Sequence, residues 1–303
     1  MIFRVGSLEI HLINDGMTRV DGGGAFGLVP RILWAPVLPP DEENLIPMTL
    51  HNLVLRVGRQ VIVIDTGMGD RLTPKMRAIW RLDRSNGLGL IAGLAQWGLQ
   101  PEDVTLVINT HLHGDHCAGN TRFDEAGQVK PTFPNAEYVV QRREYEDAMR
   151  PNERTRATYV AANYAPLAET GQLRLLDAGE EELAPGVFGV VTPGHTPGHM
   201  SIRFESDGQH ALFTGDMATY AVHFERLGWM TAYDVEPLVT LETKRRWQTW
   251  ALERDALLIF PHDPQIPAAR LTETAQGGRK LVPLPDPTSQ AINSAGHCLS
   301  SHS

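Results

Sequence analysis

The stretch INTHLHGDHCAGN, residues 108–120, carries three histidines and an aspartate within six positions. They are His111, His113, Asp115 and His116. Imidazole and carboxylate groups are ligands that zinc and related divalent ions take from proteins. On a loop that leaves a strand, residues 111 and 113 point to one side, while residues 115 and 116 turn to a neighbouring point. One short loop would therefore supply ligands to two adjacent ions.

Four ligands do not complete two metal sites, so the remaining ligands must come from elsewhere in the chain. The candidates are His195 in TPGHTPGH, Asp216 in FTGD and His262 in FPHD. Each follows an apolar run and has a glycine or proline beside it to turn the chain. Gly194 and Gly215 would let the backbone pass close to an ion.

The elements that must position these residues are short buried strands. Four apolar runs, VIVID, LVINTH, ALFTGD and LLIFPH, each end on a titratable residue. In folds built from strands and helices, chemistry collects at strand ends and in the loops that follow them. Hairpins are predicted around Gly6 and Gly58. Helices are predicted over 142–149, over 153–169, and over 234–252 with Asp234 as the N-cap.

The length and composition fit a globular enzyme. The chain has 303 residues, 42% of them apolar, and a formal net charge of -9. This charge argues against a nucleic acid or an anionic membrane as partner, because phosphate binding depends on lysine and arginine. We expect one domain over residues 1–282 and a poorly ordered, proline- and serine-rich tail over 283–303.

The two cysteines and the lengths of the apolar runs indicate in which cellular compartment the protein is expected. Cys117 and Cys298 are far apart in the sequence, so a disulfide scaffold is not indicated and a reducing cytoplasm is the expected location. We expect no secretory signal and no membrane span, since no apolar run is long enough. Cys117 follows His116 directly. A nucleophile or ligand and a small helix-starting residue are both open interpretations, and we favour the second.

The motifs resemble those of the metallo-β-lactamase superfamily. THLHGDH matches its HxHxDH signature, IDTG lies upstream of it, and TPGHTPGH, FTGD and FPHD follow it in the same order as in that family. The resemblance covers residues 1–280 in outline. It implies an α/β fold, a four-layer αβ/βα sandwich with metals at one edge of two facing sheets.

The resemblance also implies a set of ligands for two divalent metal ions, with zinc expected and manganese, cobalt or iron as alternatives. It makes His111, His113 and His195 ligands of one ion, Asp115, His116 and His262 ligands of the second, and Asp216 a bridge between them. Asp65 matches a position that supports a ligand without binding metal. For His199 a packing or supporting role is favoured over ligation.

Two such ions hold a hydroxide at neutral pH, which would attack a lactone or ester carbonyl while Asp115 or Asp216 passes on the proton. The N-terminal loop resembles that of the lactonase and organophosphate-hydrolase branches. Tyr220 lies one residue from where the lactonases place a tyrosine that donates to the substrate. Phe26, Leu28, Trp34 and Leu38 are expected to line an apolar pocket, or equally to hold the loop to the core or to a second subunit. His223, Phe224, Trp229 and Met230 are expected to line the mouth of the site, or alternatively to pack under the helix that follows.

The expected partner is a small-molecule substrate, with a homodimer as a further expectation. Within the superfamily, a phosphotriester hydrolase and a β-lactamase are the alternatives. A thioesterase of the glyoxalase II type and a ribonuclease Z-like nuclease are disfavoured, because both would need a basic patch or arm. A non-catalytic metal-binding module is the alternative outside enzymes. It is disfavoured because a structural zinc site needs only four ligands.

Overall fold

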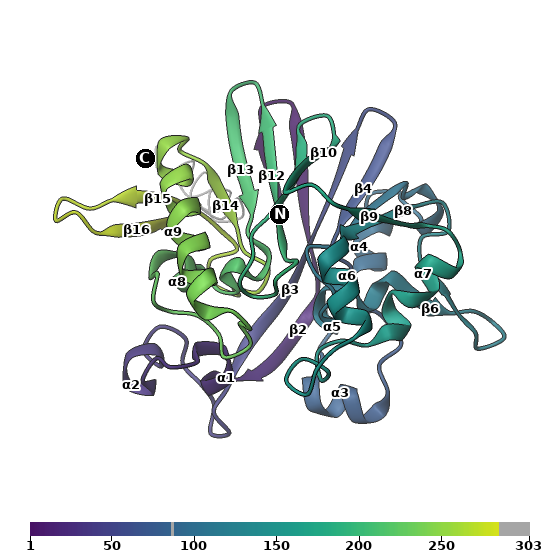
Figure 1. Cartoon of the computed structure of the whole chain (residues 1–303), viewed down its shortest axis with the longest axis horizontal. Coiled ribbons are helices and arrows are strands. Elements are labelled where there is room, and N and C mark those ends of the chain that lie inside the picture. Colours follow the sequence, from purple (N-terminus) through teal and green to yellow (C-terminus); the bar gives the residue numbers. More distant parts are fainter. Residues whose placement is uncertain (86–87, 285–303) are drawn as a thin grey trace, which may run out of the picture.

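Two seven-stranded sheets frame the protein in the computed structural model, which describes residues 1–85 and 88–284 (Figure 1). The strands of the first sheet, in spatial order, are β1 (Ile2–Val5), β2 (Leu8–Asp21), β3 (Leu45–Val57), β4 (Gln60–Ile64), β5 (Leu106–Ile108), β8 (Glu137–Gln141) and β9 (Leu173–Leu176). Those of the second are β10 (Glu180–Ala184), β11 (Val187–Val191), β12 (Met200–Ser206), β13 (Gln209–Phe213), β14 (Leu257–Ile259), β15 (Ala268–Glu273) and β16 (Arg279–Pro283). A small ribbon is formed by β6 (Thr121–Phe123) and β7 (Val129–Pro131).

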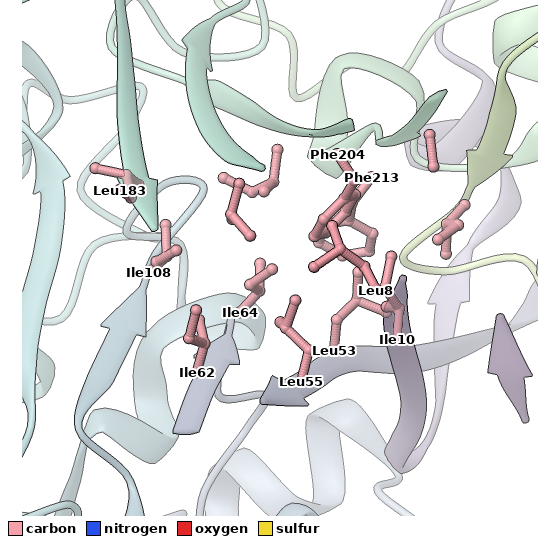
Figure 2. Close-up of a cluster of buried hydrophobic side chains, with 14 of the residues drawn as sticks. Leu8, Ile10, Leu53, Leu55, Ile62, Ile64, Ile108, Leu183, Phe204 and Phe213 are labelled. Atoms are coloured by element: carbon pink, nitrogen blue, oxygen red, sulfur yellow. The ribbon is translucent and has the colours of Figure 1, made fainter. Parts of the chain in front are cut away.

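The main core lies between the two sheets. Alternate residues of a strand point to opposite faces, so a strand covered on both sides contributes to two layers. In β3, Leu53 and Leu55 point between the sheets, while Val54 packs on the outer side. Strands β4 and β5 alternate in the same way. Phe204 and Phe213 of the second sheet fill the interior opposite them (Figure 2).

Helices cover the outer face of each sheet (Figure 1). On the first sheet lie α4 (Leu90–Ala95), α6 (Arg142–Met149) and α7 (Ala165–Glu169), and on the second lie α8 (Ala221–Glu225) and α9 (Pro237–Glu253). The predicted four-layer αβ/βα sandwich is therefore confirmed. The remaining helices are α1 (Gly22–Phe26), α2 (Arg31–Trp34), α3 (Pro74–Trp80) and α5 (Gly114–Cys117), with 3₁₀ turns at Pro101–Asp103, Ala118–Asn120, Ala161–Asn163 and Gly215–Ala218.

Two parallel strand pairs bring the predicted motifs to the same edge. β4 and β5 run parallel with Ile64 opposite Ile108, and β13 and β14 run parallel with Phe213 opposite Ile259. Parallel neighbours end at the same edge of a sheet, so the residues that follow them emerge side by side. The hairpins predicted at Gly6 and Gly58 are also present, as β1-β2 and β3-β4.

The helix predicted over residues 153–169 is wrong. Most of that segment forms turns, and its helical parts are the 3₁₀ turn at Ala161–Asn163 and α7 at its end. The side chain of Asn152 accepts hydrogen bonds from the amides of Arg154 and Thr155, as a helix N-cap would, but Tyr159 forms a backbone bridge with His113 and the chain continues in turns. Pro166 lacks an N–H and is tolerated only in the first turn of a helix, where α7 places it.

The ends of two predicted segments also differ from the structure. Helix α9 begins at Pro237, so Asp234 is not its N-cap. Strand β16 continues to Pro283, which pairs with Ala269. The tail predicted to be poorly ordered otherwise falls at 285–303, outside the described residues. Within the described ranges, no helix combines the length and apolarity needed to cross a membrane.

Candidate metal centre

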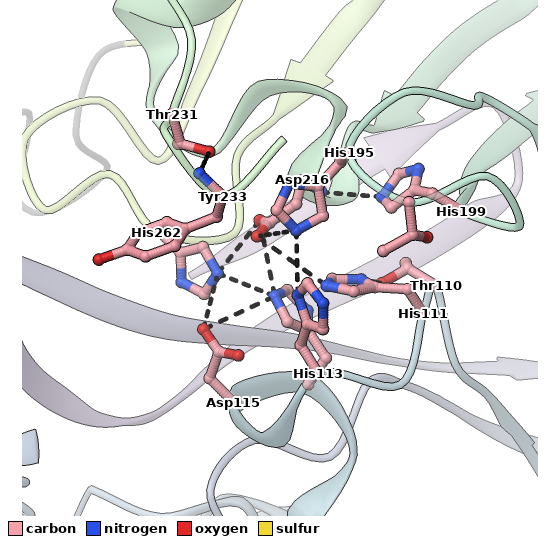
Figure 3. Close-up of polar contacts among 12 residues, drawn as sticks. Thr110, His111, His113, Asp115, His195, His199, Asp216, Thr231, Tyr233 and His262 are labelled. Atoms are coloured by element: carbon pink, nitrogen blue, oxygen red, sulfur yellow. Dashed lines mark hydrogen bonds and ion pairs between the residues drawn. The ribbon is translucent and has the colours of Figure 1, made fainter. Parts of the chain in front are cut away.

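The loops after several strands meet at one point at the edge of the two sheets. The loop after β5 carries His111 to His116, the loop after β11 carries His195, and the turns after β13 and β14 carry Asp216 and His262. Figure 3 shows side chains that point toward one another, among them those of His111, His113, Asp115, His195, Asp216 and His262. All but Asp115 are buried in the protein. Residues from four separate segments thus form one polar cluster inside an otherwise apolar fold.

The first group consists of His111, His113 and His195, whose ligand atoms lie within 4.8 Å of one another. Nε2 of His195 lies 3.1 Å from Nδ1 of His113. Oδ2 of Asp216 lies 3.3 Å from Nε2 of His195 and 4.0 Å from Nε2 of His111. One carboxylate oxygen therefore faces this group of three imidazoles.

The second group consists of Asp115, His116 and His262, within the same 4.8 Å limit. The Nε2 atoms of His116 and His262 lie 2.9 Å apart. Oδ1 of Asp216 lies 3.2 Å from Nε2 of His262 and 3.5 Å from Nε2 of His116. The other oxygen of Asp216 thus faces the second group, so this one carboxylate lies between the two.

The chemistry of these groups fits divalent cations. Nε2 of His111 and Oδ1 of Asp216 are buried and form no hydrogen bond within the described residues, although buried polar atoms are nearly always satisfied. Burial, followed by the charge of neighbouring imidazoles, lowers the pKa of His111 and His113 well below 6.5. Both are therefore neutral near pH 7, the form in which imidazole binds a metal. Imidazoles facing a carboxylate are the donor set of a divalent metal site.

The carboxylate of Asp216 stays ionised. Burial raises its pKa, but the imidazoles of His262, His116 and His195 outweigh burial and bring the pKa well below 3.8. An ionised carboxylate accepts through both oxygens, which suits a bridging position.

Asp65 forms hydrogen bonds with the loop that carries the histidines. Its Oδ1 accepts from the amide of Thr110 at 2.8 Å. Its Oδ2 accepts from the Thr110 hydroxyl at 2.8 Å and lies 2.9 Å from Nδ1 of His116. Asp65 has a φ of 54°, a conformation that non-glycine residues seldom adopt. The surrounding hydrogen bonds hold this conformation and fix the orientation of the His116 ring.

His199 lies outside both groups of ligand atoms. Its Nδ1 lies 2.8 Å from the Thr192 hydroxyl, and its Nε2 accepts from the amide of Asp216 at 2.9 Å. A Cβ on Gly215 would come within 2.6 Å of this Nε2. His199 therefore positions the backbone of the Asp216 turn, and Gly215 is needed for the close approach.

Two further supports were not predicted. Asp234 accepts from the Thr231 hydroxyl at 3.0 Å, and its Oδ1 lies 2.8 Å from Nδ1 of His195. The carbonyl of Thr49 lies 2.7 Å from Nδ1 of His262. Asp234 lies 39 positions from its histidine, and Thr49 acts through its backbone. No spacing rule in the sequence points to either.

Several of the predicted pocket residues form an aromatic cluster. Phe26 stacks on Trp34 with 5.0 Å between ring centroids and on Tyr220 with 6.1 Å. His223 and Trp229 meet the same ring edge-on at 5.2 and 5.8 Å. The Tyr220 hydroxyl donates to the carbonyl of Pro47 at 3.3 Å.

The other predicted pocket residues are placed differently. Leu38 is buried in the same cluster as Phe26. Phe224 packs on Phe260 in the layer between the second sheet and its helices. Leu28 is fully exposed, and Met230 is half-buried with its carbonyl close to Gly27. The aromatic cluster therefore centres on Phe26.

Cys117 is buried, and its thiol donates to the carbonyl of Leu112 at 3.2 Å. Burial raises the pKa of the thiol well above 9. The thiol is therefore protonated at neutral pH, which favours the packing role over a nucleophile or ligand.

Comparison with known sequences finds relatives over most of the chain. The sequence profile of the metallo-beta-lactamase superfamily matches residues 51–261. An N-acyl homoserine lactonase from Bacillus sp. is 30% identical over 244 residues, which cover 75% of this chain and 85% of that protein. The N-acyl homoserine lactonase AttM of Rhizobium radiobacter is 27% identical over 218 residues, covering 67% of this chain and 77% of AttM.

Comparison with solved structures finds the same fold. A probable metal-dependent hydrolase from Staphylococcus aureus is similar with a TM-score of 0.84 and 30% identity, covering 94% of this chain and 99% of that one. AidC, a dizinc quorum-quenching lactonase, is similar with a TM-score of 0.76 and 18% identity, covering 94% of this chain and 97% of AidC. At 18% identity the likeness to AidC concerns the fold alone.

Proposed function

The chain belongs to the metallo-beta-lactamase superfamily, and from this premise we propose that it is a metal-dependent hydrolase that opens lactone rings. The observation that carries the proposal is the position of Asp216. Its two oxygens face two separate groups of three ligand residues, at 3.2 and 3.3 Å from the nearest imidazole nitrogens. This arrangement suits two divalent ions that share one carboxylate.

The ligands of the first ion would be His111, His113 and His195. Those of the second would be Asp115, His116 and His262, with Asp216 shared. Nitrogen and oxygen donors of this kind favour zinc, which we propose as the metal. When bound, two such ions supply Lewis-acid polarisation of a carbonyl oxygen and a water that ionises near neutral pH.

The chain's own carboxylates would handle the proton that the reaction releases. The side chain of Asp115 is 14% exposed and that of Asp216 is 8% exposed. Asp115 is thus closer to solvent and is the better candidate to pass a proton toward the leaving oxygen. Tyr220 would have to give up its bond to the carbonyl of Pro47 before it could donate to a substrate.

The substrate class follows from the aromatic cluster and from the relatives. The lactonases that match this chain act on N-acyl homoserine lactones by name, and AidC was solved with the product N-hexanoyl-L-homoserine. Phe26 and Trp34 are buried, whereas the ring of Trp229, which meets Phe26 edge-on, is partly exposed and is the candidate to contact an acyl group.

His223 adds a polar group to the aromatic cluster. Both of its ring nitrogens are buried and have no hydrogen-bond partner in the described part of the chain. Burial, followed by the charge of Lys244, lowers the pKa of His223 to about 3, so the ring is neutral. A neutral imidazole offers one donor and one acceptor, which complement the N–H and C=O of an amide. An N-acylated lactone carries such an amide beside its ring.

The test is a hydrolysis panel with the metal-loaded chain. It compares N-acyl homoserine lactones, plain γ-lactones, aryl esters, a phosphotriester and a β-lactam, after loading with zinc, manganese or cobalt. We expect the acylated lactones to give the highest kcat/KM, and His210→Ala, at a histidine away from the site, to behave as wild type. Failure to open any lactone with every metal would refute the proposal. A homodimer and a cytoplasmic location stay predictions.

A further inference from the structure

Glu144 is a fully buried carboxylate that the proposed chemistry does not use. It lies in α6, and its side chain points into the protein beneath the histidine loops. Oε1 accepts from the amide of Leu112 at 2.9 Å and from the Tyr159 hydroxyl at 2.9 Å. Oε2 accepts from the Thr196 hydroxyl at 2.5 Å. Glu144 is thus bonded to three segments that are distant from it in sequence.

Each of these partners is next to a proposed ligand of the first ion. Leu112 stands between His111 and His113, and Thr196 follows His195. Tyr159 packs on the ring of His113 with 5.0 Å between centroids and forms a backbone bridge with the same residue. One carboxylate therefore touches both loops that carry the three imidazoles.

The packing around Glu144 brings the second loop close to α6. A Cβ on Gly198 would come within 2.2 Å of the backbone nitrogen of Glu144. Only glycine permits this approach, because any larger residue would meet backbone atoms. The loop from Thr192 to His199 consequently lies directly on the first turn of α6.

The choice of a carboxylate here is costly in free energy. A buried carboxylate loses its hydration, and all three of its partners are uncharged groups. Only an ionised carboxylate accepts from all three donors at once, since it has no proton of its own to place. An apolar residue of similar size would avoid the cost and lose the connection between the loops. The carboxylate therefore points to a role in holding the two loops in a fixed arrangement.

We propose that Glu144 is a positioning residue, which ties the His111–His113 loop to the His195 loop and so holds the three-imidazole group in the arrangement that binds the first ion. This inference rests on the metal ligands assigned in the proposed function. It predicts that losing the carboxylate weakens one metal site and largely spares the other, whose ligands Asp115, His116 and His262 do not contact Glu144.

The test compares Glu144→Ala, Glu144→Gln and Thr196→Val with wild type, and uses Glu146→Ala, an exposed position on the same helix, as the matched control. Two quantities are measured. The first is the affinity for each of the two ions, by competition with a coloured chelator. The second is the hydrogen exchange rate of the Leu112 amide in the metal-free chain, which depends on its bond to Glu144 and needs no bound metal.

We expect Glu144→Ala to weaken one ion about 10- to 100-fold, the range found when outer partners of metal ligands are removed. Glu144→Gln should restore most of this affinity, because the amide oxygen still accepts from Leu112 and Tyr159. Thr196→Val should fall between wild type and Glu144→Ala. Exchange at Leu112 should accelerate in Glu144→Ala and stay close to wild type in Thr196→Val and Glu146→Ala.

Equal loss of both ions, or unchanged affinity in Glu144→Ala, would overturn the proposal. So would Leu112 exchange in Glu144→Ala that matches wild type. Neither readout uses lactone turnover. A wild-type chain that binds two ions and opens no lactone would therefore refute the proposed substrate and leave the test of Glu144 valid.

Discussion

Replacing Asp234 with alanine should weaken metal binding although Asp234 is not a proposed ligand. The carboxylate is 4% exposed and lies 2.8 Å from Nδ1 of His195. It also accepts from the Thr231 hydroxyl at 3.0 Å. Its loss leaves a buried imidazole nitrogen and a buried hydroxyl without their partner. A hydrogen bond to a charged group contributes about 1.5–3 kcal/mol, which corresponds to about 10- to 100-fold in an equilibrium constant.

The assay is zinc affinity by chelator competition, together with kcat/KM for an acylated lactone. Asp234→Ala should lose about 10- to 100-fold in the affinity of the ion held by His195, in line with other outer partners of metal-bound histidines. Asp234→Asn should lose less, because the amide oxygen can still accept from His195. Thr231→Val is the control that removes only the second contact. Zinc affinity in Asp234→Ala within twofold of wild type would refute the idea that this carboxylate orients the imidazole.

Three other changes should have distinct outcomes. Asp216→Ala should reduce lactone turnover at least about 10³-fold, because both proposed ions lose their shared ligand. Circular dichroism checks that the variant still folds, and turnover near the wild-type level would contradict the prediction. His223→Phe should lower kcat/KM for an N-acyl homoserine lactone by about tenfold and leave kcat/KM for a plain γ-lactone nearly unchanged. Equal losses on both substrates would argue against recognition of the amide by His223. Lys244 donates to the carbonyls of His223 and Trp229, and burial lowers its pKa from 10.5 to about 8. Between these two pH values the unfolded chain binds more protons than the folded chain, so the free energy of unfolding of wild type relative to Lys244→Met should rise by about 3 kcal/mol from pH 8 to pH 10.5. Urea unfolding measures this difference in stability. A difference that does not change with pH would contradict the lowered pKa.

The strand ends and the candidate ligand residues could be predicted from the sequence because both signals are local. A short apolar run followed by a titratable residue marks the end of a buried strand, and the structure places His111, Asp216 and His262 directly beyond such strands. The parallel pairing of β4 with β5 and of β13 with β14 then brings these ends together. No local pattern in the sequence predicts which strands pair. The order of the motifs predicted the fold, and the fold contains these pairs.

What sequence reasoning missed depends on tertiary contacts. Asp234 precedes Pro237 in a pattern typical of a helix N-terminus, yet its carboxylate forms a bond to a histidine 39 positions away. The segment 153–169 has helix-forming residues, but Tyr159 is instead held beside His113 by Glu144. Phe224 was predicted to line the pocket because it is a large apolar residue near Asp216, but it packs in the core on Phe260. In each case the partner across the fold decides the role.

The central claim is that Asp216 joins two metal sites in one lactone-opening centre. The most direct test titrates the metal-free chain with zinc and follows opening of an N-acyl homoserine lactone after each addition. The structure predicts that activity rises to a plateau at two zinc ions per chain, and that Asp216→Ala shows no such rise. Full activity at one ion per chain, or activity that zinc does not change, would contradict the claim.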